Sequence, residues 1–364
     1  MARAPSNKRR TSHRPNIHDV AARAGVSAGT VSNVLTGRRA VVPRLADRVR
    51  AAVAELGYVT DAAASHLRRS QSTVVGVLVP DLTNRFFARF VGLVEGLVRA
   101  DGYRVLVASS GVDAAMEAAE LRALVAWKPA GLIVIPCEDR FASREALAGT
   151  NIPVVVADRF DERPRVDAVG LDNPDAARRA AAHLLDLGHR RILVVASTLE
   201  LYNVRERVAG ARDAFGAAAK AGTPEVLELG TQLEPAADTL FARLGRKAIP
   251  TAIVALTNTC TLAALLALSR RELTVPEDVS LVGFDDDDWM QVVHPAITAV
   301  RQPMADMALA AWRRLTERLA GDTSPPRRSQ LRSTLELRAS TAARTAVPTQ
   351  RRVRTAVRSR ATAY

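Results

Sequence analysis

Residues 17–37 read IHDVAARAGVSAGTVSNVLTG, and their apolar spacing and glycines predict the structure of the N-terminal part of the chain. Its first apolar residues recur at helical spacing, and Gly25 follows where a left-handed C-terminal cap is expected. Ser27 is a residue type that N-caps helices, and a second apolar stripe begins just after it. That stripe consists of Val31, Val34 and Leu35. The stretch therefore predicts two short helices joined by a Gly-Val-Ser turn.

A third helix is expected soon after this pair. Pro43 suits the first turn of a helix, residues 44–56 keep apolar side chains at helical spacing, and Gly57 follows as a stop. Three short helices around a small core, with a tight turn between the first two, are typical of a helix-turn-helix unit. We therefore predict a helix-turn-helix domain at residues 16–60.

The ends of the chain carry most of its positive charge. The 364 residues have a formal net charge of +13, and residues 1–15 contain five Lys and Arg and no acidic residue. A basic N-terminal part beside a near-neutral remainder indicates contact with a polyanion. Residues 342–364 are also basic, but there Arg alternates with Ala, Thr, Val and Ser, which favours a solvated tail. We predict a basic disordered arm at residues 1–15 and a basic disordered tail at residues 342–364.

From residue 72 the pattern changes to short apolar runs that alternate with amphipathic helices. The runs expected to form strands are Val74–Val79, Arg104–Ala108, Gly131–Ile135, Pro153–Ala157, Ile192–Ala196, Ala252–Leu256 and Val279–Phe284. Continuously apolar strands between helices indicate parallel sheets covered on both faces. About 270 residues is large for one core, so residues 72–341 are expected to form two α/β lobes. Ligands of such folds bind at the carboxyl ends of the strands, here between the lobes.

Residues 61–71 join the two predicted parts. They begin DAAASHLR, an Ala-rich segment that Asp61 could cap, but an isolated helix of this length is marginal in water. We predict a hinge that becomes helical only when something holds it.

The composition excludes several other classes of protein. Hydrophobic residues make up 48% of the chain, which argues against a disordered protein. No apolar run reaches the roughly 18 residues of a membrane helix, and residues 1–16 lack the apolar stretch of a secretory signal. Cys137 and Cys260 are too few for a disulfide framework. We therefore expect a cytoplasmic protein with no membrane partner.

Ordered short strings along the chain resemble one known family. They include residues 17–27 (IHDVAARAGVS), 75–81 (VGVLVPD), 183–189 (HLLDLGH), 282–286 (VGFDD) and 301–303 (RQP). In this order they closely resemble the lactose-repressor family of transcription regulators, and the resemblance covers residues 16–341. It implies a three-helix DNA-binding head and a two-lobed α/β body similar to periplasmic binding proteins. The body would bind the effector and dimerise.

The resemblance places the second helix of the head in the major groove of DNA. On this basis Ala28, Gly29 and Thr30 face the bases, and Ser32 and Asn33 follow them. Ala28 and the Thr30 methyl group suit a thymine methyl group, and Asn33 can pair with adenine. Gly29 has no side chain with which to contact a base. For Ala28 and Gly29, simple helix packing is an equally good interpretation.

Basic residues and the hinge complete the predicted DNA contacts. Arg38, Arg39 and Arg44 are candidates for phosphate contacts, the alternative being a solvated basic face. Leu67 matches the hinge leucine of the family, which inserts between base steps in the minor groove, and Arg68 follows it. The alternative for Leu67 is a linker residue packed against the body.

The resemblance also implies an effector site between the lobes. Arg207 matches a bidentate donor there, Asp285 an acceptor, and Asn258 a group that both donates and accepts. Weaker candidates on the same rim of strand ends are Asp81, Phe87 and Asp158, and loop solvation or helix capping is the alternative role of these acids. Residues 229–235 contain no aromatic side chain, so a ring-shaped ligand is expected to lack a stacking partner there.

Catalysis is not expected. The sequence contains no G-x-G-x-x-G or P-loop string. Asp285–Asp288 are interpreted as a solvated loop rather than a metal site, and His183 and His189 as residues at a capped helix end. Cys137 and Cys260 are expected to be buried structural thiols. We predict no catalytic residue, no metal and no cofactor.

These features predict a homodimeric transcription regulator, a repressor, that binds an inverted-repeat operator in double-stranded DNA. A small-molecule effector in the interlobe cleft, a sugar or a sugar-like metabolite, would control its operator affinity. The alternative is a small-molecule binding protein without DNA-regulatory activity, similar to periplasmic sugar receptors. The complete head and the missing export signal favour the regulator.

Overall fold

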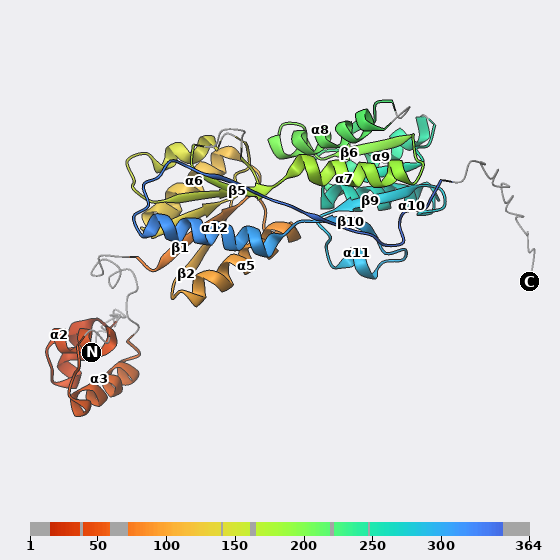
Figure 1. The fold of residues 1–364 in the computed structure, drawn as a ribbon. Helices are drawn as coiled ribbons and strands as arrows, with labels where there is room; N and C mark the ends of the chain where they lie inside the picture. Colours follow the sequence, from red (N-terminus) through yellow and green to blue (C-terminus); the bar gives the residue numbers. More distant parts are fainter. Residues whose placement is uncertain are drawn as a thin grey trace, which may run out of the picture. The chain divides into compact units, whose positions relative to one another are not determined.

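The structure is a computed structural model that describes residues 15–36, 39–58, 72–139, 141–160, 165–218, 222–246 and 248–344. They belong to two compact units, and the boundary between the units lies at residues 72–73 (Figure 1). We call residues 15–58 the head and residues 73–344 the body. No described helix is long and apolar enough to cross a membrane.

The head consists of three helices, α1 (Ile17–Ala24), α2 (Ala28–Thr36) and α3 (Pro43–Leu56). The Asn16 side chain accepts the amide N–H groups of His18 and Asp19, and the Asp19 carboxylate accepts the Asn16 amide N–H at 2.8 Å. This reciprocal capping box fixes the start of α1. Gly25 ends the helix with φ 62°, the left-handed conformation that favours glycine. The helix-turn-helix prediction is confirmed.

The core of the head is small. Val20, Val31 and Val49 are fully buried, one from each helix, and together they hold the three helices around one centre. Val42 precedes α3 and makes no side-chain capping bond, because its side chain has no acceptor.

The body begins with a lobe built on six parallel strands, which we call the N-lobe. In spatial order the strands are β11 (Arg328–Leu331), β5 (Asp167–Leu171), β4 (Val154–Ala157), β3 (Gly131–Val134), β1 (Val74–Val79) and β2 (Arg104–Ser109). Helices α5 (Arg85–Ala100) and α12 (Met304–Leu319) cover one face of this sheet. Helix α6 (Ala114–Ala126) and the 3-10 helix η1 (Ala142–Leu147) cover the other face.

The second lobe, the C-lobe, repeats this layered arrangement. Its strands in spatial order are β12 (Thr334–Glu336), β10 (Thr298–Arg301), β9 (Ser280–Phe284), β8 (Ala252–Ala255), β6 (Ile192–Ala196) and β7 (Glu225–Glu228), with β12 antiparallel. Helices α7 (Asn173–Asp186) and α8 (Tyr202–Ala217) pack on one face. Helices α9 (Leu233–Arg246) and α10 (Asn258–Arg270) pack on the other, and the short helix α11 (Trp289–Val292) follows β9.

Two α/β lobes with largely parallel sheets confirm the predicted fold class. The described chain passes between the lobes three times, after β5, after β10 and after β11 (Figure 1). Asn173 follows the first of these crossings and Gln302 lies in the second, and both side chains are buried. Strands β5, β7, β10, β11 and β12 were not among the predicted apolar runs.

The end of the described chain is tied to the C-lobe. The ring nitrogens of His183 and His189 lie 3.0 Å from the Thr341 hydroxyl and the Ala342 carbonyl oxygen, and the Arg344 amide N–H donates to the Leu187 carbonyl oxygen at 2.8 Å. The two histidines therefore hold this segment, and they flank the predicted capped end of α7, where Gly188 has φ 89°. Residues 342–344 therefore also contact the C-lobe.

Candidate DNA-binding and effector-binding sites

The N-terminal end of α2 is the candidate base-reading surface of the head. The Ser27 hydroxyl accepts the Thr30 amide N–H at 3.2 Å and lies 3.0 Å from the Thr30 hydroxyl, which caps the helix as predicted. Gly29 is exposed, whereas Ser32 and Asn33 are half-buried on the same part of the helix. Ala28 is half-buried and packs against the core of the head, which supports the packing interpretation for this residue.

The predicted phosphate contacts are only partly within the described residues. Arg39 and Arg44 are exposed, which leaves both side chains accessible to a phosphate. Arg38, Leu67 and Arg68 lie outside the described residues, as do all of the predicted hinge and most of the predicted arm and tail.

Arg207 is the most deeply embedded of the candidate effector residues. It projects from α8 and is 3% exposed. Its Nε donates to the Asn173 side-chain oxygen at 2.8 Å, and one Nη donates to the Leu256 carbonyl oxygen at 2.7 Å. The guanidinium also stacks 4.1 Å above the Phe284 ring. These contacts hold the cation in one orientation at the carboxyl ends of β8 and β9.

Two buried carboxylates flank Arg207, one from each lobe. Asp158 follows β4 of the N-lobe, and Asp285 follows β9 of the C-lobe, both with positive φ. Burial raises the pKa of each carboxyl group, and the nearby Arg207 opposes that rise. Asp158 Oδ1 is buried and has no hydrogen-bond partner among the described residues. A buried acceptor without a donor marks a place where a ligand donor or a water is expected.

Asp285 and Asn258 are connected. Asp285 accepts the Gln302 side-chain N–H at 2.6 Å and the Asn258 amide N–H at 3.0 Å. The Asn258 side chain donates to the Asn84 side-chain oxygen at 3.0 Å, and this bond joins the C-lobe to the N-lobe. Asp158, Arg207, Asn258 and Asp285 thus form one connected, largely buried group with members from both lobes.

The remaining two candidates differ in their environment. Asp81 lies on the rim of the cleft, where its carboxylate accepts the Thr83 amide N–H at 2.8 Å. Phe87 is 4% exposed and belongs to the N-lobe core, with the Arg159 guanidinium 5.1 Å from its ring centre. Phe87 therefore supports Arg159 and offers little surface to a ligand.

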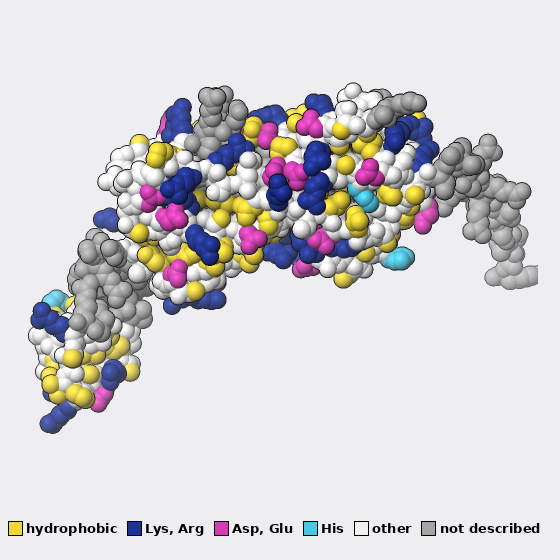
Figure 2. All heavy atoms as spheres, viewed as in Figure 1, with side chains coloured by type: hydrophobic (Ala, Val, Ile, Leu, Met, Phe, Trp, Pro, Cys, Tyr) yellow, Lys and Arg dark blue, Asp and Glu magenta, His cyan; other side chains and the backbone are white. Residues whose placement is uncertain are grey.

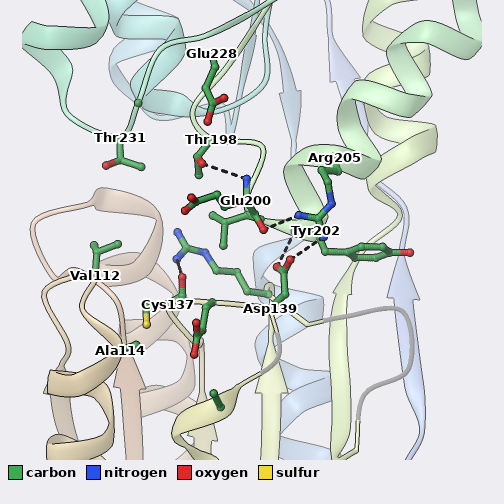
Figure 3. Close-up of a pocket in the computed structure, with 15 residues that line it drawn as sticks. Val112, Ala114, Cys137, Asp139, Thr198, Glu200, Tyr202, Arg205, Glu228 and Thr231 are labelled. Carbon is green, nitrogen blue, oxygen red and sulfur yellow. Dashed lines mark hydrogen bonds and ion pairs between the residues drawn. The ribbon is translucent and has the colours of Figure 1, made fainter.

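Two cavities open along the cleft. The smaller has a volume of about 460 Å³, and Asp81, Asn84, Asn258 and Trp289 contribute to its lining. The larger has a volume of about 1230 Å³ and is lined by residues of both lobes, several of them shown in Figure 3. Thr231 lines both cavities, so they adjoin at the loop after β7.

Several cleft residues were not predicted. Trp289 supplies an aromatic side chain to the smaller cavity, although residues 229–235 contain none. In the larger cavity the Asp139 carboxylate accepts the Tyr202 amide N–H at 2.6 Å and an Arg205 N–H at 2.9 Å. Trp289 follows a predicted strand by a few residues and could have been found from that position. No local sequence signal pairs Asp139 with a helix more than 60 residues away.

The acidic run after β9 is buried, so its interpretation as a solvated loop was wrong. Asp285, Asp286 and Asp287 are each less than 10% exposed, while Asp288 is exposed. Asp286 pairs with Arg301 at 2.7 Å and with Arg338 at 2.6 Å. Burial acts to raise the pKa of Asp286, but hydrogen bonds from these two arginines hold it below its usual range.

Cys137 and Cys260 are buried, as predicted, and burial raises the pKa of each thiol to about 12. Such thiols remain protonated near neutral pH and are poor nucleophiles.

Over the visible face of the body, acidic and basic side chains are intermixed without a large patch of one sign (Figure 2). Non-specific attraction to a polyanion is therefore not expected from that face.

A helix-turn-helix head followed by a two-lobed α/β body with a polar cleft defines the class of DNA-binding transcription regulators that carry an effector domain. Comparison with known families agrees with this class. Residues 16–61 match the description "Bacterial regulatory proteins, lacI family", and residues 181–341 match "Periplasmic binding protein-like domain".

Individual relatives match over nearly the whole chain. The HTH-type transcriptional regulator PtxS of Pseudomonas plecoglossicida is 34% identical over 90% of this chain and 96% of its own length. The catabolite control protein A of Priestia megaterium is 30% identical over 89% of this chain and 98% of its own. The chain belongs to the lacI family of bacterial regulatory proteins, which are non-enzymatic transcription regulators.

Solved structures show the same architecture. The lac repressor dimer bound to operator and the anti-inducer ONPF is 25% identical, with a TM-score of 0.80 over 91% of this chain and 100% of that chain. The complex of the transcriptional regulator CelR with cellobiose is 28% identical, with a TM-score of 0.64 over 90% of this chain and 100% of that one. The DNA-binding head in this family argues against the alternative of a binding protein without DNA-regulatory activity.

Proposed function

We propose that the chain is a cytoplasmic repressor that acts as a homodimer on an inverted-repeat operator. Each head would place α2 in the major groove of one half-site, because the two-fold symmetry of a dimer matches that of an inverted repeat. The lac repressor relative is a dimer bound to operator, which supports this proposal. In the same proposal residues 61–71 form the hinge, with Leu67 in the minor groove and Arg68 beside it.

Sequence reading is assigned to the start of α2. Thr30, Ser32 and Asn33 would contact base edges, with Ala28 and Gly29 allowing a close approach. Arg38, Arg39 and Arg44 would contact phosphates and fix the register of the head on the duplex. The exposure of Arg39, Arg44 and Gly29 supports this assignment.

The effector site is assigned to the interlobe cleft around Arg207. The observation that carries this assignment is the buried, unpartnered Asp158 Oδ1 beside a fixed guanidinium and a second carboxylate. A ligand that supplies hydroxyl donors would satisfy Asp158, Asp285 and Asn258 together. The CelR relative was solved with cellobiose, which supports a sugar-like effector.

Control of DNA binding follows from the contacts between the lobes. Asn84 bonds to Asn258 across the smaller cavity, and Asp139 bonds to Arg205 across the larger one. A ligand in the cleft changes operator affinity only if it binds one lobe spacing better than another. Residues that hold the lobes at this spacing are therefore part of the proposed switch.

Fluorescence anisotropy with a labelled fragment of the protein's own promoter region tests the DNA-binding part. Asn33→Ala should weaken binding by about 1–3 kcal/mol, the range for losing one good bidentate base contact. Ala54→Ser, an exposed change on α3, is the matched control and should bind as the parent does. Equal binding by the parent and Asn33→Ala would remove Asn33 from the base-reading surface.

A further inference from the structure

The larger cavity is separate from the residues assigned to the effector. Its lining comes from the N-lobe loops near Val112, Ala114 and Cys137 and from the C-lobe residues Thr198 and Glu228, as Figure 3 shows. Its lining includes none of the four assigned residues, which are Asp158, Arg207, Asn258 and Asp285. The four buried residues assigned to the effector therefore do not explain what this cavity binds.

The size of the cleft exceeds what one sugar ring needs. Cavities of about 300–1,000 Å³ hold drug-sized ligands, and the smaller cavity alone falls in this range at about 460 Å³. The larger cavity adds about 1230 Å³, and the two adjoin at Thr231. A ligand bound in the smaller cavity can therefore extend past Thr231 into the larger one.

The polar groups of the larger cavity are mostly acceptors. Its four carboxylates are those of Glu138, Asp139, Glu200 and Glu228, against two guanidinium groups. Of the carboxylates, Asp139 is paired with Arg205, and Glu228 accepts the Leu199 amide N–H at 2.9 Å. The excess of acceptors and of negative charge suits a ligand rich in hydrogen-bond donors and disfavours an anion.

The two cations of the cavity, Arg205 and Arg159, differ in how strongly they are bound by neighbouring residues. Arg205 donates to Asp139 and to the carbonyl oxygens of Leu199 and Glu200. Arg159 donates to the Cys137 carbonyl oxygen at 3.4 Å and lies over the Phe87 ring. Arg205 is therefore not left to pair with the carboxylate of a sugar acid or with a phosphate, and the lining keeps two more carboxylates than guanidinium groups.

The two cavities also differ in the aromatic side chains that they offer to a ligand. Trp289 lines the smaller cavity, where it can stack on the apolar face of a sugar ring. In the larger cavity the Tyr202 ring points away from Thr231 and Glu228 (Figure 3). A sugar unit in the larger cavity would therefore be held by hydrogen bonds rather than by stacking.

We propose that the larger cavity is a second compartment of the effector site that takes a non-anionic, hydroxyl-rich glycosyl unit, so that the effector is an uncharged or amine-bearing disaccharide or longer saccharide. This inference rests on the proposed function of the cleft as the effector site. It excludes sugar acids and sugar phosphates as effectors.

The test uses the full-length protein and two matched variants. Ala114 and Ala115 are both exposed at the start of α6, but only Ala114 lines the larger cavity. Ala114→Trp therefore places an indole in the larger cavity, whereas Ala115→Trp adds the same side chain outside it. Isothermal calorimetry would measure binding of cellobiose, maltose and lactose, of their parent monosaccharides, and of cellobionate, maltobionate and lactobionate.

The expected result is that at least one neutral disaccharide binds and that Ala114→Trp weakens its affinity at least about tenfold. Ala115→Trp should bind that disaccharide as the parent does. Three results would overturn the inference but leave the effector cleft in place. They are binding of monosaccharides alone, binding of the aldonate forms alone, and binding of a disaccharide equally well by the parent and by Ala114→Trp. If no saccharide binds, the inference also fails. Anisotropy with the promoter fragment then shows separately whether the DNA-binding function stands.

Discussion

Replacing Arg207 by Met tests whether the buried cation holds the cleft together. The guanidinium is 3% exposed, donates to Asn173 and to the Leu256 carbonyl oxygen, and faces two buried carboxylates, Asp158 and Asp285. Met has a similar length and no charge. Arg207→Met therefore leaves both acids in place without their cation.

The expected loss of stability is large for a single substitution. Removing one partner from a buried charge cluster costs about 3–5 kcal/mol, because the remaining charge stays buried and uncompensated. For a domain of this size each kcal/mol lowers the melting temperature by roughly 2–4 °C. Arg207→Met should therefore melt roughly 6–20 °C below the parent. Arg212→Met, at an exposed position of the same helix, should melt within about 2 °C of it.

The loss of stability in Arg207→Met is expected to depend on pH. Burial raises the pKa of Asp158 and Asp285, and Arg207 counteracts the rise, so its removal raises both pKa values further. A carboxyl group with a raised folded-state pKa destabilises the protein above that pKa, and the penalty disappears as the pH falls through it. The stability gap between parent and variant should therefore be smaller at about pH 5 than at about pH 8.

Differential scanning calorimetry at both pH values measures the gap. Adding Asp158→Asn to Arg207→Met should recover part of the lost stability, because it removes one of the two stranded charges. A melting temperature of Arg207→Met within about 2 °C of the parent at pH 8, or a gap that widens toward pH 5, would refute the account of the buried cluster.

Three further predictions concern DNA binding and assembly. Size-exclusion chromatography with light scattering should show at least a dimer at micromolar concentration, and a monomer would contradict the homodimer. Deleting residues 1–14 should make operator binding less dependent on salt. For 6–10 phosphate contacts the operator affinity falls on the order of 10³–10⁵-fold between 50 and 200 mM salt. An unchanged slope after the deletion would mean that the arm does not contact DNA. Leu67→Ala should weaken specific binding by a few kcal/mol and leave non-specific binding nearly unchanged. If parent and variant bind and bend the operator equally, the hinge is only a tether.

The head was predictable because its signals are local. Gly25 and Gly57 end helices with positive φ, Ser27 caps α2, and the apolar residues keep one period throughout. Most strands inside the two sheets were predictable for the same reason, since each is a continuous apolar run, but the interior strands β5 and β10 were missed. Strands such as β11, which reads RSQL, were missed because an edge strand needs little apolar surface and pairs through its backbone.

The interior of the cleft was only partly predictable. The position of Asp285 after a strand indicated a place on the rim, but its burial depends on Gln302 and Arg207 from other elements. Asp286 is buried because Arg301 and Arg338 reach it from later parts of the chain. Sequence patterns of short range cannot show such pairs, because the residues meet only when the three interlobe crossings are in place.

Operator affinity measured with and without a saturating effector tests the central claim most directly. The claim is that a ligand in the interlobe cleft controls the DNA-binding head. Anisotropy titrations of the promoter fragment with the parent should show a change of about 5–150-fold when the effector is added, the usual range of coupling between two sites. The same titrations with Asp285→Asn should show little change, because Asp285 holds Asn258 and Gln302 in the cleft. An effector that binds the parent in the cleft but leaves its operator affinity unchanged would contradict the account.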